Sequence, residues 1–186
     1  MFDEERIARS RPMKNRLFMF LAIIFIAGSV ICTSAAAQTT FYVVRHAEKI
    51  VSKTNRDPEL SEAGKSRAET LSRTLRSAKV DVCLSTKYKR TSLTLAPTAK
   101  RFGGKVEVYA AGKERGLTKK WLKDYSGKTV LIAGHSNTVP AILTGLGVTE
   151  KLKLEDHHYD NLFMVKIAKD GKVSFTHLHY GKADPE

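Results

Sequence analysis

Three groups of polar residues directly follow apolar runs in this sequence, and together they could carry out phosphoryl chemistry. Arg45 and His46 follow the first run, Arg90 belongs to the second group, and His135 belongs to the third. An arginine fork can hold two phosphate oxygens at once, and a neutral histidine is a nucleophile near neutral pH. Flanking guanidinium groups would keep the imidazole uncharged and stabilise the transition state. These residue types predict a phosphate pocket that requires no metal ion, and the sequence shows no clear cluster of metal ligands.

The elements that would position these residues are short apolar runs that alternate with amphipathic helical segments. We expect strands over residues 40–45, 80–85, 105–109 and 129–133, and a closing hairpin of 161–168 and 173–180. We expect helices over residues 61–78, 89–102, 117–125 and 139–146. This alternation predicts an α/β fold, a three-layer sandwich with a mainly parallel central sheet and an antiparallel edge hairpin. Ligands bind beyond the carboxyl ends of parallel strands, which is where the three polar groups lie.

Four segments resemble the signature segments of the histidine phosphatase superfamily, the group related to phosphoglycerate mutases and acid phosphatases. They are VVRHAEK at residues 43–49, LSEAGKSRAETL at 60–71, STKYKRTSLTLAP at 85–97 and VLIAGHSNTVPAIL at 130–143. They occur in the family's order and at its spacing, and they span nearly all of the chain after residue 37. The resemblance implies a phosphoglycerate mutase-like fold for this part of the chain.

The resemblance also implies a role for each residue of the pocket. His46 would be the nucleophile that forms a phosphohistidine, which water then hydrolyses. Arg45, Arg90 and His135 would complete the phosphate pocket. We expect Ser136 and Asn137 to cap the helix that follows them rather than to bind phosphate.

The proton donor for the leaving group is less clearly marked in the sequence. This role ordinarily falls to a carboxyl group, and in the family it comes from the region between the third strand and the second histidine. Glu114, just past the third predicted strand, is our first choice, ahead of Asp124. Two departures from the family pattern stand near the nucleophile. Ala47 replaces the usual glycine, and residues 50–52 lack the asparagine that helps several relatives to hold phosphate.

Residues 1–37 have the pattern of a secretory signal peptide. A basic start and a long apolar run precede small residues that end at Ala37, after which we expect cleavage. Counting from Met13 gives a signal of ordinary length, so translation could begin there. The alternative is an uncleaved N-terminal anchor, at the short end for a bilayer span. Both interpretations predict that residues 38–186 form an exported catalytic domain that is periplasmic, secreted or anchored to the membrane.

The charge of the chain favours an anionic partner. The 186 residues carry a formal net charge of +13, and losing the five basic and three acidic residues of 1–37 leaves +11. The basic residues are scattered, with few aromatic residues between them. We therefore expect a small phosphorylated substrate and no nucleic acid, and membrane contact only if the N-terminal segment stays uncleaved.

The sequence favours a metal-independent phosphohydrolase without a cofactor, acting on phosphate monoesters through a phosphohistidine on His46. A phosphoglycerate mutase-type phosphotransferase is one alternative, but the 45 positions from Arg90 to His135 leave no room for the mutases' larger insertion. A non-catalytic binder of phosphorylated ligands is another, which the absence of a proton donor such as Glu114 would favour. An intracellular phosphohistidine-protein phosphatase of similar size is disfavoured by the export signal.

Overall fold

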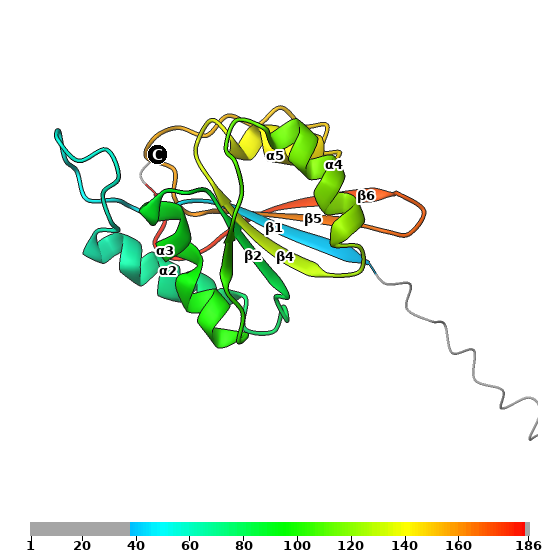
Figure 1. Cartoon of the computed structure of the whole chain (residues 1–186), viewed down its shortest axis with the longest axis horizontal. Coiled ribbons are helices and arrows are strands. Elements are labelled where there is room, and N and C mark those ends of the chain that lie inside the picture. The colour runs from blue at the N-terminus through cyan, green and yellow to red at the C-terminus, as the bar shows by residue number, and fades with distance from the viewer. Residues whose placement is uncertain (1–37, 185–186) are drawn as a thin grey trace, which may run out of the picture. The chain divides into compact units, whose positions relative to one another are not determined.

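A six-stranded sheet forms the centre of the protein (Figure 1). The computed structural model describes residues 38–184, so the predicted signal peptide or anchor and its cleavage site lie outside the described residues. The strands are β1 (Thr39–Arg45), β2 (Val82–Ser85), β3 (Val106–Val108), β4 (Thr129–Gly134), β5 (Asn161–Ile167) and β6 (Val173–His179), in the order β3-β2-β4-β1-β5-β6. The first four run parallel, whereas β5 and β6 pair antiparallel at one side. The predicted mainly parallel sheet with an edge hairpin is confirmed.

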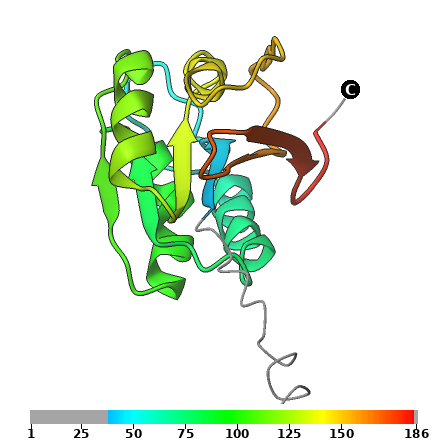
Figure 2. The same ribbon diagram turned by 90° about the vertical axis from the view of Figure 1, so that its right-hand side faces the viewer.

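Helices cover both faces of this sheet. They are α2 (Glu62–Thr74), α3 (Lys89–Arg101), α4 (Glu114–Asp124) and α5 (Val139–Gly145). The pair α2 and α3 lies on one face and the pair α4 and α5 on the other, as Figures 1 and 2 show from two directions. The three-layer sandwich is therefore confirmed. None of the helices within residues 38–184 is long and apolar enough to cross a bilayer.

Strand β1 is buried on both faces, as its unbroken apolar run predicts. Phe41 and Val43 are fully buried in the core on the α4 and α5 side, and Val44 is fully buried on the α2 and α3 side. Burying each such side chain stabilises the fold by about 1.5–3 kcal/mol. The strand therefore holds its carboxyl end, and the residues that follow it, in a fixed place between the two helical layers.

Several elements differ from their predicted bounds, among them α2, α4 and β3. Helix α2 ends at Thr74 rather than near residue 78, because the chain turns there and Lys79 has a left-handed φ of 49°. Helix α4 begins three residues earlier than predicted, at Glu114. Strand β3 is shorter than predicted and its side chains are largely exposed, as suits a strand at the edge of a sheet. Pro97 lies inside α3 without ending it.

Gly64 lies where α2 presses against the backbone of Glu48, two residues beyond His46. A Cβ atom at Gly64 would overlap the carbonyl oxygen of Glu48, which also accepts hydrogen bonds from the Ser61 amide (2.9 Å) and hydroxyl (3.2 Å). We expect Gly64→Ala to lower the free energy of unfolding by about 2–4 kcal/mol, because backbone rather than a flexible side chain must move. Urea unfolding measures this loss.

Gly116→Ala provides the matched control for Gly64→Ala. Gly116 also lies in a helix, but nothing stands within 4 Å of the position of its Cβ. Alanine there should raise the free energy of unfolding by about 0.5–1 kcal/mol, since alanine favours helix more than glycine does. Equal stabilities for the two variants would contradict the close approach of α2 to Glu48.

Candidate active site

A pocket of about 460 Å³ lies beyond the carboxyl ends of the parallel strands. Its lining includes all four residues predicted for the phosphate pocket: Arg45, His46, Arg90 and His135. A hollow of about 480 Å³ lies near the opposite end of β1, where Lys169 is the only charged residue of the lining. This hollow near Lys169 therefore lacks the group of positively charged side chains that marks a binding site for an anion.

The register of two neighbouring strands brings the histidines together. Strands β1 and β4 are parallel, Arg45 stands opposite Gly134, and the His46 amide donates to the Gly134 carbonyl at 3.0 Å. His46 and His135 therefore follow two adjacent strand ends at the same level. Their ring centroids are 5.4 Å apart, with the rings edge to face. The two residues are 89 positions apart in the sequence, and only the sheet makes them neighbours.

His46 presents one defined nitrogen for chemistry. Its Nδ1 lies 2.8 Å from the carbonyl oxygen of Ala47, and a carbonyl can only accept, so Nδ1 carries the hydrogen. In the neutral ring Nε2 then holds the free electron pair. Burial lowers the pKa of His46, the bond to Ala47 opposes this effect, and the charges of Arg45, Arg90 and His135 add to it, so that the pKa lies at about 3. The ring is therefore neutral at physiological pH, and Nε2 is the nitrogen that is free to bond to a ligand.

His135 is also held neutral, but in the other tautomer. Nη2 of Arg90 lies 3.4 Å from its Nδ1, and a guanidinium can only donate, so Nδ1 accepts. Its Nε2 then carries the hydrogen and donates to the Thr86 hydroxyl at 3.1 Å. Burial, followed by Arg90 and Arg45, lowers the pKa of His135 to about 4.

Arg45 is held by the segment that precedes β5. Its Nη1 donates to the carbonyl oxygens of Glu155 (2.9 Å) and His158 (3.3 Å), and its guanidinium carbon lies 4.3 Å from the centre of the Tyr159 ring. Asp156, which is highly exposed, is 3.6 Å from Nη2. The side chain is buried, so these contacts fix its charge beside the pocket.

Arg90 enters the pocket from the first turn of α3. Its guanidinium carbon lies 4.4 Å from the centre of the Tyr88 ring. Within residues 38–184, the buried Nε atoms of Arg90 and Arg45 have no hydrogen-bond partner. Buried donors are normally paired, and two guanidinium groups around one pocket can pair with the oxygens of a tetrahedral anion. The arrangement therefore suits a phosphoryl group.

Two threonines of the signature segments hold the pocket in shape. The Thr94 hydroxyl donates to the Arg90 carbonyl at 2.7 Å and accepts from the Ala47 amide at 2.8 Å, which ties α3 to the residue after the nucleophile. The Thr86 hydroxyl lies 2.8 Å from that of Thr91 and accepts from His135. Both threonines are buried, so their bonds are shielded from water.

Glu114 is not among the residues that line this pocket. The side chain is buried at the first residue of α4, where Oε1 accepts a hydrogen bond from the Gly112 amide at 2.7 Å. This bond caps the turn before the helix and satisfies one of the free donors there. The role of Glu114 as proton donor stays a prediction. In the structure its carboxylate supports the turn.

Several lining residues carried no signal in the sequence. Val51, Asp156 and Tyr159 all line the pocket although no motif marks them, and Lys49 lines it from the end of the first signature segment. Val51 is 91% exposed and lies within residues 50–52, which lack the expected asparagine. The carbonyl oxygen of His158 contacts Arg45, whereas its ring lines a separate hollow.

The low pKa of His46 predicts how stability depends on pH. The unfolded chain titrates this ring near its ordinary value of 6.5, whereas the folded chain does so near pH 3. Between these values the unfolded state binds more protons, so stability falls as the pH falls below 6.5 and is unaffected above it. Between pH 7 and pH 5, the titration of His46 should lower the free energy of unfolding by about 2 kcal/mol. Urea unfolding of the parent and of His46→Ala at both pH values should show the smaller loss in the variant, and equal losses would contradict a depressed pKa.

Comparisons with known proteins agree with this geometry. The sequence model of the histidine phosphatase superfamily (branch 1) matches residues 41–119, a span that includes His46 and Arg90 and stops before His135. No curated protein matches the chain. The chain therefore matches the model of this superfamily over residues 41–119, and it has the phosphoglycerate mutase-like fold that the signature segments predict.

Solved structures share the fold at low sequence identity. The protein histidine phosphatase SixA, complexed with tungstate, is 14% identical over 75% of this chain and 96% of its own, with a TM-score of 0.62. A mycobacterial glucosyl-3-phosphoglycerate phosphatase is 14% identical over 78% of this chain and 100% of its own, with a TM-score of 0.58. A phosphoserine phosphatase from Entamoeba histolytica, in complex with 3-phosphoglyceric acid, is 16% identical over 78% of this chain and 98% of its own, also with a TM-score of 0.58. At these identities the solved structures establish the fold that the chain shares with these phosphatases.

Proposed function

We propose that the protein is a metal-independent phosphohydrolase that works through a phosphohistidine on His46. The observation that carries this proposal is the bond from Nδ1 of His46 to the Ala47 carbonyl, which leaves Nε2 unprotonated in a pocket with two arginines. Without such positive charge around it, a buried neutral imidazole would have no phosphoryl group bound within its reach. Here the cationic groups bind the phosphoryl oxygens and orient phosphorus toward the nitrogen.

The reaction has two steps on these residues. In the first, Nε2 attacks phosphorus, an Nε2–P bond forms, the bond from phosphorus to the leaving group breaks, and the leaving group departs with the bonding electron pair and takes a proton from solvent. In the second, a water oxygen attacks the same phosphorus and releases a proton to solvent, the Nε2–P bond breaks, and phosphate and the neutral ring are regenerated. Arg45 and Arg90 balance the oxygens' charge in both steps.

The first step requires a proton for the leaving group, and the donor is the least well-defined part of the site. Asp156 is the only carboxylate that lines the pocket within residues 38–184, and its side chain is 93% exposed. A carboxylate that is exposed to water is not held in place to deliver a proton to a leaving group. The site is therefore suited to leaving groups that depart without a strong acid: aryl phosphates, acyl phosphates and phosphoramidates. Phosphohistidine on a protein is one such phosphoramidate, and the name of SixA includes that activity.

A panel of phosphate compounds tests this proposal. Phosphate release is measured in excess EDTA from an aryl phosphate, an alkyl phosphate and a phosphoramidate. We expect the aryl ester and the phosphoramidate to react at least about a hundredfold faster than the alkyl ester, because general acid catalysis contributes about 10²–10⁴-fold where it operates. Glu114→Gln should change none of these rates if the carboxylate only caps its turn. A large loss on the alkyl ester alone would instead establish Glu114 as the acid.

The exposed state of Asp156 also favours one competing function, a non-catalytic binder of phosphorylated ligands. A binder would hold inorganic phosphate yet release none from any ester. Turnover of even the aryl ester, lost in His46→Ala, would exclude it.

We further propose that the domain acts after export, on the basis of the signal-like residues 1–37. Fractionation of cells that express the chain, with sequencing of the mature N-terminus, tests this location.

A further inference from the structure

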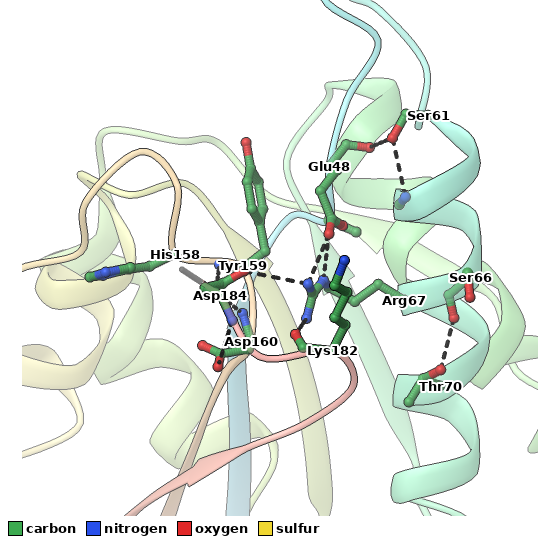
Figure 3. A network of polar contacts seen from close by, with 12 residues as sticks. Glu48, Ser61, Ser66, Arg67, Thr70, His158, Tyr159, Asp160, Lys182 and Asp184 are labelled. Carbon is green, nitrogen blue, oxygen red and sulfur yellow. Dashed lines mark hydrogen bonds and ion pairs between the residues drawn. The ribbon is translucent and has the colours of Figure 1, made fainter. Parts of the chain in front are cut away.

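We propose that Asp184, at the C-terminal end of the described chain, is a positioning residue for the phosphate pocket. It acts by holding Tyr159 against Arg45, and the inference rests on the proposed function because it assigns Arg45 to phosphate binding. Asp184 lies 138 positions from His46, and no signature segment includes it. Figure 3 shows the polar network that joins Asp184 to Glu48 through Arg67.

The Asp184 carboxylate clamps the start of β5. Its Oδ2 accepts hydrogen bonds from the backbone amides of Tyr159 and Asp160, the second at 2.7 Å. The Asp184 side chain is only 8% exposed, and its Oδ1 lies 3.4 Å from Nη2 of Arg67. Charge-assisted bonds of this kind are stronger than neutral ones, and losing the acceptor would leave two part-buried amides unpaired. Asp184 therefore fixes the backbone at Tyr159.

The buried Arg67 side chain in turn holds the segment that carries Asp184. Nη1 of Arg67 donates to the carbonyl oxygens of Tyr180 (3.2 Å) and Lys182 (3.0 Å). On its other side, Nε donates to Oε1 of Glu48 at 2.9 Å, two residues beyond the nucleophile. One guanidinium on α2 thus connects the loop after His46 with the C-terminal segment 180–184.

Tyr159 connects the backbone held by Asp184 to the phosphate pocket. Its ring lies against the Arg45 guanidinium, and the ring centre is 6.1 Å from that of His46. Residues 155–159 have no helix or strand hydrogen bonds of their own, yet they supply the carbonyl oxygens and the ring that position Arg45. A segment without regular structure keeps a fixed course only if its ends are held, and Asp184 holds one end.

The test compares three variants of the full chain with the parent: Asp184→Ala, Tyr159→Ala and the double variant. The probe is inorganic phosphate, with its dissociation constant measured by calorimetry and kcat and KM measured on an aryl phosphate. We expect each single variant to raise the phosphate dissociation constant on the order of tenfold, because small displacements of a positioning group cost this much or more. The double variant should match the singles, since both changes disrupt the same restraint.

Two controls separate positioning from general loss of stability. Asp81→Ala removes a carboxylate that accepts from the Thr129 amide at 2.7 Å, at the start of β4 and away from the pocket. It should lower the melting temperature while leaving the phosphate dissociation constant unchanged. Tyr159→Phe keeps the ring over Arg45 and should raise the phosphate dissociation constant less than Tyr159→Ala does. If Asp184→Ala does not fold, Asp184→Asn replaces it. Because asparagine retains one acceptor oxygen, the rise in the phosphate dissociation constant should be smaller.

The outcomes distinguish this inference from the proposed function. A parent chain that neither binds phosphate nor hydrolyses the aryl ester overturns both. A parent that binds and hydrolyses, together with a folded Asp184 variant of unchanged phosphate affinity, overturns the positioning role alone. Additive losses in the double variant would also overturn it, because Asp184 and Tyr159 would then act independently.

Discussion

His46→Ala is expected to reduce phosphate release from an aryl phosphate at least about a thousandfold, the largest effect of any single change in this protein. The variant loses the atom that forms the covalent bond to phosphorus, and nothing else in the pocket replaces it. His135 cannot, because its Nε2 carries the hydrogen donated to Thr86 while its Nδ1 faces Arg90. Initial rates with purified parent and variant measure the loss.

The same variant should still bind inorganic phosphate, because Arg45 and Arg90 remain. Trapping provides a second readout: base-quenched parent protein should retain label from a ³²P-labelled aryl phosphate, and His46→Ala should retain none. His157→Ala is the matched control, since His157 is exposed and does not line the pocket. It should keep the activity and the label of the parent. Substantial turnover by His46→Ala would refute the covalent mechanism.

Arg90→Lys is expected to lower kcat/KM on the aryl ester by about 10²–10³-fold, although it conserves the charge. The guanidinium presents a planar fork to two phosphate oxygens, rests on the Tyr88 ring and contacts His135. A lysine ammonium is a point charge that cannot make this set of contacts together. Losing one preorganised donor at the transition state commonly costs this much. Steady-state kinetics with the phosphate dissociation constant separate the effect on binding from the effect on rate.

Lys87 offers a control for charge alone. Its ammonium lies 5.7 Å from the centre of the same Tyr88 ring, but the residue is exposed and does not line the pocket. Lys87→Ala removes one positive charge a few positions away and should change kcat/KM by less than about threefold at 0.15 M salt, because screening is strong at the surface. A loss comparable to that of Arg90→Lys would mean that general positive charge, rather than the Arg90 fork, binds the substrate.

The sequence alone determined the class of fold and four of the pocket residues. Apolar runs and helical periodicity are local properties, so they revealed the strands and their carboxyl ends without any knowledge of the tertiary structure. Because ligands bind at such ends, Arg45, His46, Arg90 and His135 could be grouped before their distances were known. The signature segments then indicated the family, whose model matches residues 41–119.

Only the tertiary structure decided how these residues are oriented and what supports them. The tautomers of the two histidines follow from contacts with a carbonyl oxygen, a hydroxyl and a guanidinium. The orientation of the Glu114 carboxylate toward Gly112 and the placement of Tyr159 by Asp184 depend on the course of segments without regular structure. No periodic pattern predicts that course, because each contact is a single bond that no regular spacing repeats. Strands and helices could be predicted because their hydrogen bonds repeat locally, whereas the irregular segments that shape the pocket depend on individual bonds that do not repeat.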